Sequence, residues 1–179
     1  MQFQSKLADI PTTIFTTVSR RARELSALDI GQGFPDFPID SLLSEHVTAA
    51  MREGHNQYAP MTGVQSLREA IASKIDATYQ KSVDVDAEIT VTCGATEALH
   101  SAILSLVRSG DEVILFDPAY DSYEPVVNLA GGRCIRIPLT APLFRPDWER
   151  VAAALSSRTR LVLINNPHNP VGTVWTRSD

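Results

Sequence analysis

The amino-acid sequence predicts an α/β fold, with a mostly parallel sheet and helices on both of its faces. From Glu88 onward, short apolar runs of strand length alternate with longer segments of helical periodicity. This alternation is typical of crossover units, in which a helix connects two parallel strands that are buried on both faces. Of the 179 residues, 44% are hydrophobic and 21% are charged, as in a globular domain with its own core.

The beginning of the chain predicts an N-terminal arm and one amphipathic helix within residues 1–30. Residues 12–27 (TTIFTTVSRRARELSA) start with two threonines and place Ile14, Val18 and Leu25 at roughly helical spacing. We expect this helix to belong to an arm more than to the core.

Two more helices are predicted before the alternating pattern begins. The stretch DIGQGFPDFPID is rich in Gly and Pro, which indicates an ordered loop of a kind that often carries function. A helix is expected from Ser41 to Glu53, where Gly54 ends it. Another helix is expected from Val64 to Tyr79, because Leu67 and Ile71 fall on one face.

The alternating part predicts four strands and three helices. The strands are EITVTC (88–93), DEVILFD (111–117), RCIRIPL (133–139) and RLVLINN (160–166), and the helices are ATEALHSAILSLVR (95–108), SYEPVVNLA (122–130) and DWERVAAALSS (147–157). In sheets of this kind, ligands bind beyond the carboxyl ends of the strands. The residues that follow each strand are therefore the candidates for chemistry.

Composition and charge argue against several other classes of protein. No apolar run approaches the ~20 residues of a membrane-spanning helix, and the N-terminus lacks the apolar core of a secretory signal, so a cytoplasmic location is expected. The net charge is −5 and the 13 Arg and 3 Lys residues are scattered, which disfavours nucleic acid as a partner. Cys93 and Cys134 lack the spacing of a metal site or of a disulfide framework.

The turn after the first predicted strand is a candidate anion site. In CGATEAL, Gly94 permits a tight turn, and Ala95 and Thr96 open a helix whose N-terminal N–H groups and dipole attract negative charge. A phosphate would fit there, with the Thr96 hydroxyl as an added donor. The alternative is a plain turn in which Glu97 complements the dipole. The sequence contains neither G-x-G-x-x-G nor G-x-x-x-x-G-K-[ST], which disfavours dinucleotide and P-loop sites.

Aromatic and amide side chains follow two other predicted strands. Tyr120 and Tyr123 come after DEVILFD, where one of them is placed to stack on a flat ring or simply to pack at a helix start. Asn169 lies between His168 and Pro170, where its amide either donates to a ring oxygen or satisfies its own turn. His168 is expected to be a turn residue only. Together with the anion turn, these positions describe a site for a flat, phosphorylated, oxygen-bearing ring.

Five ordered motifs carry a resemblance to a known family. They are GQGFPDFP (31–38), NQYAPMTGVQSLREAIA (56–72), TVTCGATEAL (90–99), GDEVILFDPAYDSYEP (110–125) and RTRLVLINNPHNPVGTVW (158–175). Over nearly its whole length the chain resembles the N-terminal portion of the fold-type I, pyridoxal-phosphate-dependent aminotransferases of class I and II, in the methionine and kynurenine aminotransferase branch. The resemblance implies that residues 31–179 are an incomplete large domain that binds pyridoxal 5'-phosphate, without its C-terminal part and the small domain.

The resemblance implies roles for four residues toward the cofactor. Ala95 and Thr96 would hold its phosphate, Tyr120 would stack on its pyridine ring, and Asn169 would hydrogen-bond its 3-oxygen. Each role agrees with the chemistry that the residue types suggest by themselves.

Two further residues are implicated by the resemblance alone. Tyr58 would reach the cofactor phosphate of the other subunit, which implies a homodimer with shared sites. Gly33 would lie against the α-carboxylate of the substrate. The implied substrates are an amino acid, of methionine or aromatic type, and a 2-oxo acid.

The chain departs from the family in its lysines. In the family a Lys forms the Schiff base with the cofactor, an Asp pairs with the pyridinium nitrogen and an Arg binds the substrate carboxylate. The positions of all three follow the last residue of this sequence, and the three lysines present, Lys6, Lys74 and Lys81, do not follow predicted strands. We therefore assign no catalytic residue and expect the isolated chain to be inactive.

Several functions remain open at this point. The first is an N-terminal fragment of an aminotransferase. The second is a non-catalytic remnant or split half that associates with a partner chain. A pyridoxal-phosphate-dependent carbon–sulfur lyase of the same fold is the closest catalytic alternative, and an α/β nucleotide-binding module is disfavoured by the absent glycine-rich fingerprint.

Overall fold

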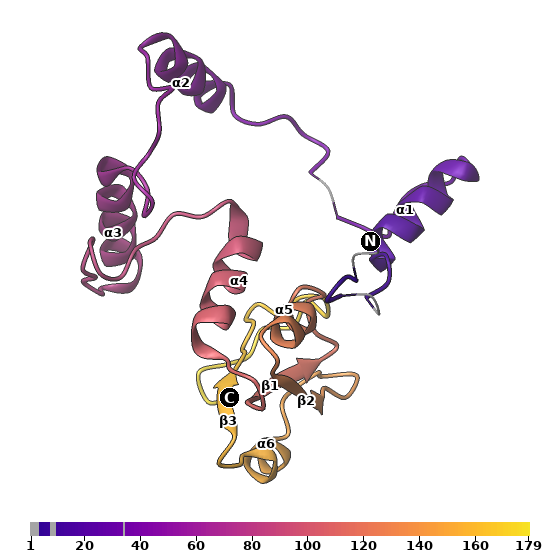
Figure 1. The fold of residues 1–179 in the computed structure, drawn as a ribbon. Coiled ribbons are helices and arrows are strands. Elements are labelled where there is room, and N and C mark those ends of the chain that lie inside the picture. Colours follow the sequence, from indigo (N-terminus) through magenta and orange to yellow (C-terminus); the bar gives the residue numbers. More distant parts are fainter. Residues whose placement is uncertain (1–3, 8–9, 34) are drawn as a thin grey trace. The chain divides into compact units, whose positions relative to one another are not determined.

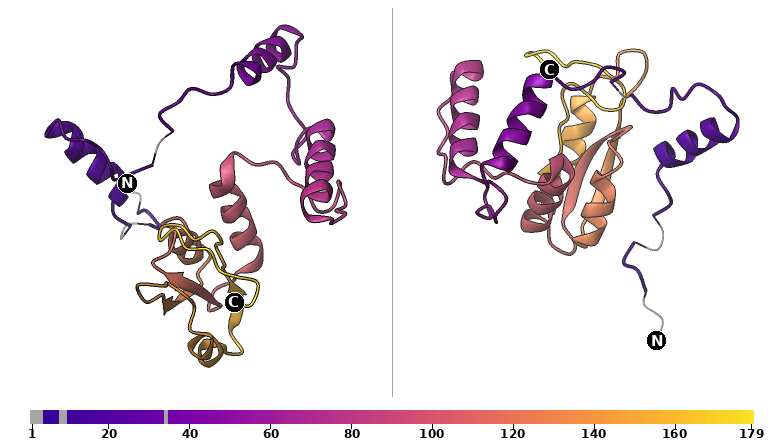
Figure 2. Two further views of the ribbon diagram at one scale, coloured as in Figure 1. Left: turned by 180° about the vertical axis from the view of Figure 1, so that it is seen from behind. Right: turned by 90° about the horizontal axis from the view of Figure 1, so that it is seen from above.

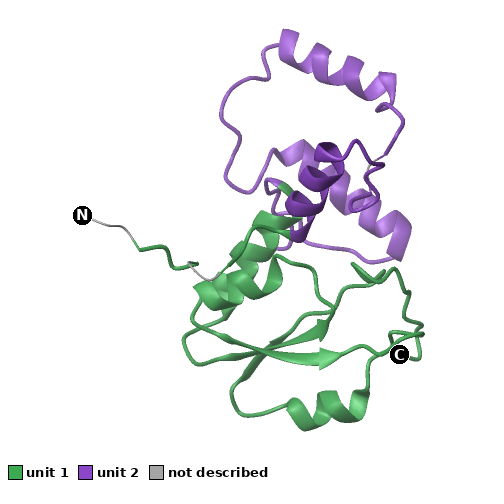
Figure 3. Cartoon of the chain, turned by 90° about the vertical axis from the view of Figure 1, so that its right-hand side faces the viewer, with its two compact units in different colours: residues 1–13, 94–179 green, residues 14–93 purple. Residues whose placement is uncertain are grey.

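The computed structural model describes residues 4–7, 10–33 and 35–179. Residues 1–3, 8 and 9 of the predicted arm and Phe34 of the GQGFPDFP motif lie outside the described residues. The chain divides into two compact units (Figure 3). We call residues 14–93 the helical unit and residues 1–13 with 94–179 the sheet unit. In the described ranges, no helix combines the length and the apolar character needed to cross a membrane.

Within its described residues, the helical unit forms the three helices expected from the sequence: α1 (Ile14–Glu24), α2 (Ser41–Arg52) and α3 (Gln65–Tyr79) (Figure 1). α1 is shorter than predicted, because Ser26 has a φ of 51°, which a right-handed helix does not contain. α2 begins where the Asp40 carboxylate accepts a hydrogen bond from the Leu42 N–H at 2.8 Å. Gly54, with a φ of 89°, follows the end of α2, as predicted.

The sheet unit contains three strands in its described part, all parallel and in the order β2-β1-β3. Its elements in chain order are α4 (Gly94–Leu106), β1 (Glu112–Asp117), α5 (Tyr123–Leu129), β2 (Arg133–Pro138), α6 (Trp148–Ala154) and β3 (Thr159–Val162). Figure 2 gives two further views of these strands and of the helices that accompany them. The predicted α/β class with a parallel sheet is confirmed.

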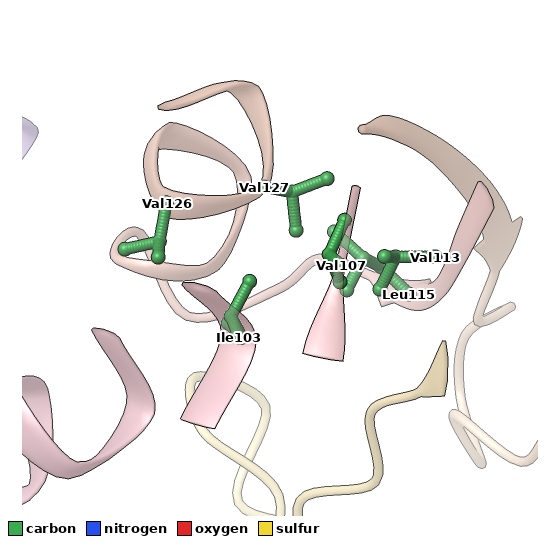
Figure 4. Close-up of a cluster of buried hydrophobic side chains, with 6 residues drawn as sticks. All are labelled: Ile103, Val107, Val113, Leu115, Val126 and Val127. Atoms are coloured by element: carbon green, nitrogen blue, oxygen red, sulfur yellow. The ribbon is translucent and has the colours of Figure 1, made fainter. Parts of the chain in front are cut away.

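The central strand β1 is buried on both faces, and its alternating side chains build two cores. On one face, Val113 and Leu115 pack with Ile103 and Val107 of α4 and with Val126 and Val127 of α5 (Figure 4). The other face has its own cluster, made by Ile114, Phe116, Ile137, Leu139, Val151 and Trp175. Since Val151 belongs to α6, helices cover both faces of the sheet, as the sequence predicts.

The predicted strand at 88–93 is wrong for this structure. Ile89 is buried, but the structure assigns no strand to residues 88–93, and the Val91 N–H donates at 3.0 Å to the carbonyl of Thr62, which lies in a turn and not in a strand. A strand requires a ladder of such bonds with a neighbouring strand, and one bond does not make a ladder. The apolar periodicity of EITVTC therefore reflects the burial of Ile89 and not hydrogen-bonded pairing with another strand.

The amino end of the sheet is held by a buried carboxylate. Glu112, at the start of β1, accepts hydrogen bonds from the Ser156 hydroxyl at 2.7 Å, from Arg133 at 2.6 Å, and from Arg158 Nε and Nη2 at 2.8 and 2.6 Å. These bonds lower the pKa of Glu112 from 4.5 to about 2, with Ser156 the largest contributor. The cluster joins β1, β2 and the turn before β3.

The Glu112 cluster predicts that the free energy of unfolding decreases in acid. Because its folded-state pKa lies below the ordinary value of 4.5, Glu112 stabilises the fold fully above that pH, and the contribution is lost as pH falls from 4.5 toward about 2. Replacing Glu112 with Gln is expected to lower the urea midpoint at about pH 7 and to change it much less near about pH 2.5. Glu53→Gln, on an exposed side chain, serves as control. An equal loss at both pH values would contradict this account.

Candidate functional site

The first turn of α4 presents backbone donors at the carboxyl edge of the sheet. α4 leads into β1 and packs along it through Ile103 and Val107, so the helix runs opposite to the strand. Gly94, with a φ of 81°, is its first residue, and Ala95 and Thr96 follow with exposed side chains. Backbone N–H groups in a first helical turn lack an acceptor within the helix, and the dipole adds positive potential there. This turn has the chemistry of an anion site.

The connection between β1 and α5 carries two tyrosines at the same edge. Tyr120 is half-buried, and its ring meets that of Tyr123 edge to face, with centroids 5.6 Å apart and an interplanar angle of 70°. The Tyr123 N–H donates to the Tyr120 carbonyl at 3.2 Å. Burial, and to a smaller extent the neighbouring Tyr120, raise the pKa of Tyr123. The Tyr123 phenol is therefore neutral at physiological pH, and the two rings together form an aromatic surface.

Asn169 lies on a hydrogen-bonded turn that follows β3. The His168 N–H donates to the Thr173 carbonyl at 2.8 Å, and the Gly172 N–H donates to the His168 carbonyl at 2.7 Å. The side chain of Asn169 is exposed, and its amide has no hydrogen-bond partner in the part of the chain that the structure describes. The amide is thus available to a ligand instead of closing its own turn.

The base of this turn is anchored by Asn166, which the sequence pattern did not indicate, and by His168, whose burial it did not predict. Asn166 accepts from the Trp175 N–H at 2.9 Å and donates to its carbonyl at 3.3 Å. His168 is buried, its ring lies 6.0 Å from the Trp175 ring, and burial lowers its pKa. His168 therefore anchors the turn as a neutral side chain. The only sequence signal for this role is the apolar Val174-Trp175 pair a few residues downstream.

The remaining two predicted residues belong to the helical unit. Tyr58 is fully exposed and borders a shallow hollow of about 230 Å³ that is also lined by His55, Pro60 and Val64. Gly33 is exposed, and a side chain added there would meet no atom within 4 Å. Four of the six predicted residues are thus placed at one edge of the sheet unit by its topology, while Tyr58 and Gly33 lie in the other unit.

The features at this edge are a helix terminus with the chemistry of an anion site, a half-buried aromatic ring and an exposed amide. Such a set suits a flat ring that bears a phosphate and an oxygen acceptor. The lysines Lys6, Lys74 and Lys81 are exposed, and none of them follows a strand: Lys74 lies on α3, Lys81 follows α3 and Lys6 precedes α1. Among the described residues, no group of His, Cys, Asp and Glu side chains is arranged to hold a metal ion.

Comparison with known proteins identifies the family of this chain. The family model "Aminotransferase class I and II" matches residues 26–179. The chain is 55% identical over 176 residues to the methionine aminotransferase of Escherichia coli (strain K12), covering 98% of this chain and 46% of that protein. It is 39% identical over 177 residues to the probable N-succinyldiaminopimelate aminotransferase DapC of Mycobacterium tuberculosis (strain H37Rv), covering 98% and 45%.

Solved structures agree with the sequence comparison. The crystal structure of YbdL from Escherichia coli, described as a methionine aminotransferase, matches with a TM-score of 0.96 and 54% identity, over 100% of this chain and 47% of that chain. N-succinyldiaminopimelate aminotransferase from Mycobacterium tuberculosis matches with a TM-score of 0.92 and 38% identity, over 99% and 47%. The chain spans about half the length of the relatives it matches. The resemblance seen in the sequence motifs is confirmed, and the chain belongs to the class I and II aminotransferase family.

Proposed function

We propose that this chain contains the cofactor-binding residues of a pyridoxal-phosphate-dependent aminotransferase. We call these residues, Ala95, Thr96, Tyr120 and Asn169, the cradle. The single observation that supports the proposal is that the topology directs three features to the carboxyl edge of one sheet: the first turn of α4, the Tyr120 ring and the exposed Asn169 amide. Ligands of open α/β sheets bind at this edge. The reaction proposed for the complete enzyme moves an amino group between an amino acid of methionine or aromatic type and a 2-oxo acid.

The residues present fit the cofactor by their chemistry. Ala95 and Thr96 offer backbone and hydroxyl donors for the phosphate, Tyr120 offers an aromatic face, and Asn169 offers an amide donor for the 3-oxygen. When bound, pyridoxal 5'-phosphate supplies an electron sink for the bonds at the substrate's α-carbon. The contribution of these side chains is to bind and orient the group.

The domain bounds, the location, the homodimer and the roles of Tyr58 and Gly33 are proposed from the resemblance to the family. Residues 31–179 would form an incomplete large domain preceded by an arm of residues 1–30, in a cytoplasmic homodimer. Tyr58 would reach the phosphate in the other subunit, and Gly33 would lie against the substrate carboxylate. The full exposure of Tyr58 is compatible with a partner for its side chain on another chain.

A second candidate function is a non-catalytic half that associates with a partner chain. It is favoured by the exposure of four apolar side chains on α2, each of them more than half exposed: Leu42, Leu43, Val47 and Met51. Such a patch predicts association. A carbon–sulfur lyase of the same fold would use the same cradle and is distinguished by its products.

The first test is an absorbance titration of the 179-residue chain with pyridoxal 5'-phosphate, followed by borohydride reduction and mass spectrometry. We expect saturable binding without a fixed adduct at any single lysine, because Lys74 and Lys81 belong to the helical unit, Lys6 precedes α1, and none of the three follows a strand of the sheet. Pyridoxal without the phosphate is the control, and we expect it to bind at least about 10-fold more weakly, because it lacks the phosphate that the helix terminus attracts. An adduct at one lysine together with 2-oxo acid formation would overturn the expected inactivity, and equal binding of both compounds would contradict the cradle.

A further inference from the structure

We propose that Arg136 is a positioning residue, which holds the loop that carries Tyr120 by binding both of its ends. The loop comprises residues 118–122, between β1 and α5, and we call it the Tyr120 loop. Arg136 lies in β2, opposite Leu115 of β1. The inference rests on the proposed function, in which the Tyr120 ring stacks on the cofactor.

The guanidinium group spans the two residues that flank the loop. Its Nη1 donates to the carboxylate of Asp117, the last residue of β1, at 2.8 Å. Its Nη2 donates to the carboxylate of Glu124, in the first turn of α5. One planar fork thus bridges the residue before the loop and a residue just after it. A lysine, with one ammonium group, does not present two donors in this fixed geometry.

The three side chains are each roughly 40% exposed, which determines what the contacts can do. Exposed ion pairs add little to the free energy of unfolding, because water and salt screen them. A fork that binds both ends of a short loop nevertheless restricts the conformations of that loop. Without Arg136, no other described side chain would bridge the carboxylates of Asp117 and Glu124, and the two ends of the loop would lose this restraint.

The backbone around the loop transmits the restraint to the ring. The Leu139 N–H donates to the Asp117 carbonyl at 2.8 Å, so the first end of the loop is also tied to the end of β2. At the other end, Tyr123 precedes Glu124 and meets the Tyr120 ring edge to face, at 5.6 Å. A shift of Glu124 relative to Asp117 would therefore change the orientation of the two rings.

Tyrosine-selective ¹³C labelling with NMR tests directly whether Arg136 holds the two ends of the Tyr120 loop, an arrangement that we call the clamp. The method suits this protein because it contains 4 Tyr. In Arg136→Gln, we expect the resonances of Tyr120 and Tyr123 to shift and broaden, while those of Tyr58 and Tyr79 stay in place. The matched control is Arg133→Gln, on the same strand, because Arg133 pairs with Glu112 at the opposite end of β2. The milder Arg136→Lys keeps the charge, and we expect it to move the same two resonances by less.

A second readout connects the clamp to the cofactor. We expect the affinity for pyridoxal 5'-phosphate to fall about 10-fold in Arg136→Gln, because the stacking surface is no longer pre-organised, and to stay unchanged in Arg133→Gln. Unchanged Tyr120 and Tyr123 resonances in both Arg136 variants would overturn the clamp. Shifted resonances together with wild-type affinity for pyridoxal 5'-phosphate would overturn the role of Arg136 in the cofactor site. A wild-type chain that fails to bind the cofactor would refute the proposed function, and the tyrosine resonances would still decide whether Arg136 holds the loop.

Discussion

Replacing Phe116 with alanine is expected to lower the free energy of unfolding by about 3–5 kcal/mol, the usual cost of removing a buried phenylalanine ring. Phe116 is 3% exposed and lies in β1, the central strand. Its ring meets Trp148 at 6.1 Å and Trp175 at 5.1 Å, both edge to face. The substitution therefore removes contacts that join α6 and the segment after β3 to the sheet.

Urea denaturation followed by tryptophan fluorescence measures this loss at the site itself. The protein contains 2 Trp, and both of them contact Phe116, so the signal reports on the same cluster. Phe37→Ala is the matched control, because Phe37 is 72% exposed and its removal is expected to change stability by less than about 0.5 kcal/mol. A loss below about 1 kcal/mol for Phe116→Ala would show that the cluster is not a tightly packed core.

Replacing Thr96 with aspartate is expected to move stability and cofactor binding in opposite directions. A carboxylate in the first turn of α4 complements the helix dipole and should stabilise the chain by about 0.3–1 kcal/mol. The same charge would lie where the proposed site holds a phosphate. Two like charges about 4 Å apart repel by roughly 1–4 kcal/mol between fully aqueous and surface conditions, which weakens binding by about 5-fold to about 1000-fold.

Thermal denaturation and titration with pyridoxal 5'-phosphate measure the two effects on the same Thr96→Asp sample. Thr96→Ser keeps the hydroxyl donor and is expected to bind the cofactor as the wild type does. Retained affinity in Thr96→Asp would place the phosphate elsewhere. Lost affinity together with lost stability would indicate a damaged helix instead of charge repulsion.

Much of the fold could be predicted because its signals are local. The helices α2 and α3 follow from apolar periodicity, and Gly54 marks the end of α2. The run VILF in β1 indicated a strand buried on both faces, and the structure buries all four side chains. The motifs after the strands also pointed to the family, because their spacing in the sequence needs no knowledge of contacts.

The error at 88–93 has a different origin. Pairing into a sheet depends on a neighbouring backbone, and apolar periodicity contains no information about where that neighbour is. The burial of His168 was missed for a similar reason, since its surroundings include Trp175, which the turn brings back onto the sheet.

The sequence by itself determined the fold class, the order of the elements apart from the strand expected at 88–93, and the types of side chain after each strand, since short-range periodicity and turn chemistry specify these. Only the tertiary structure decided which distant groups meet. Glu112 receives its partners from 21 to 46 residues away, and Arg136 reaches Asp117 across 19 residues. Such contacts depend on strand register, because one step along a strand turns a side chain to the opposite face.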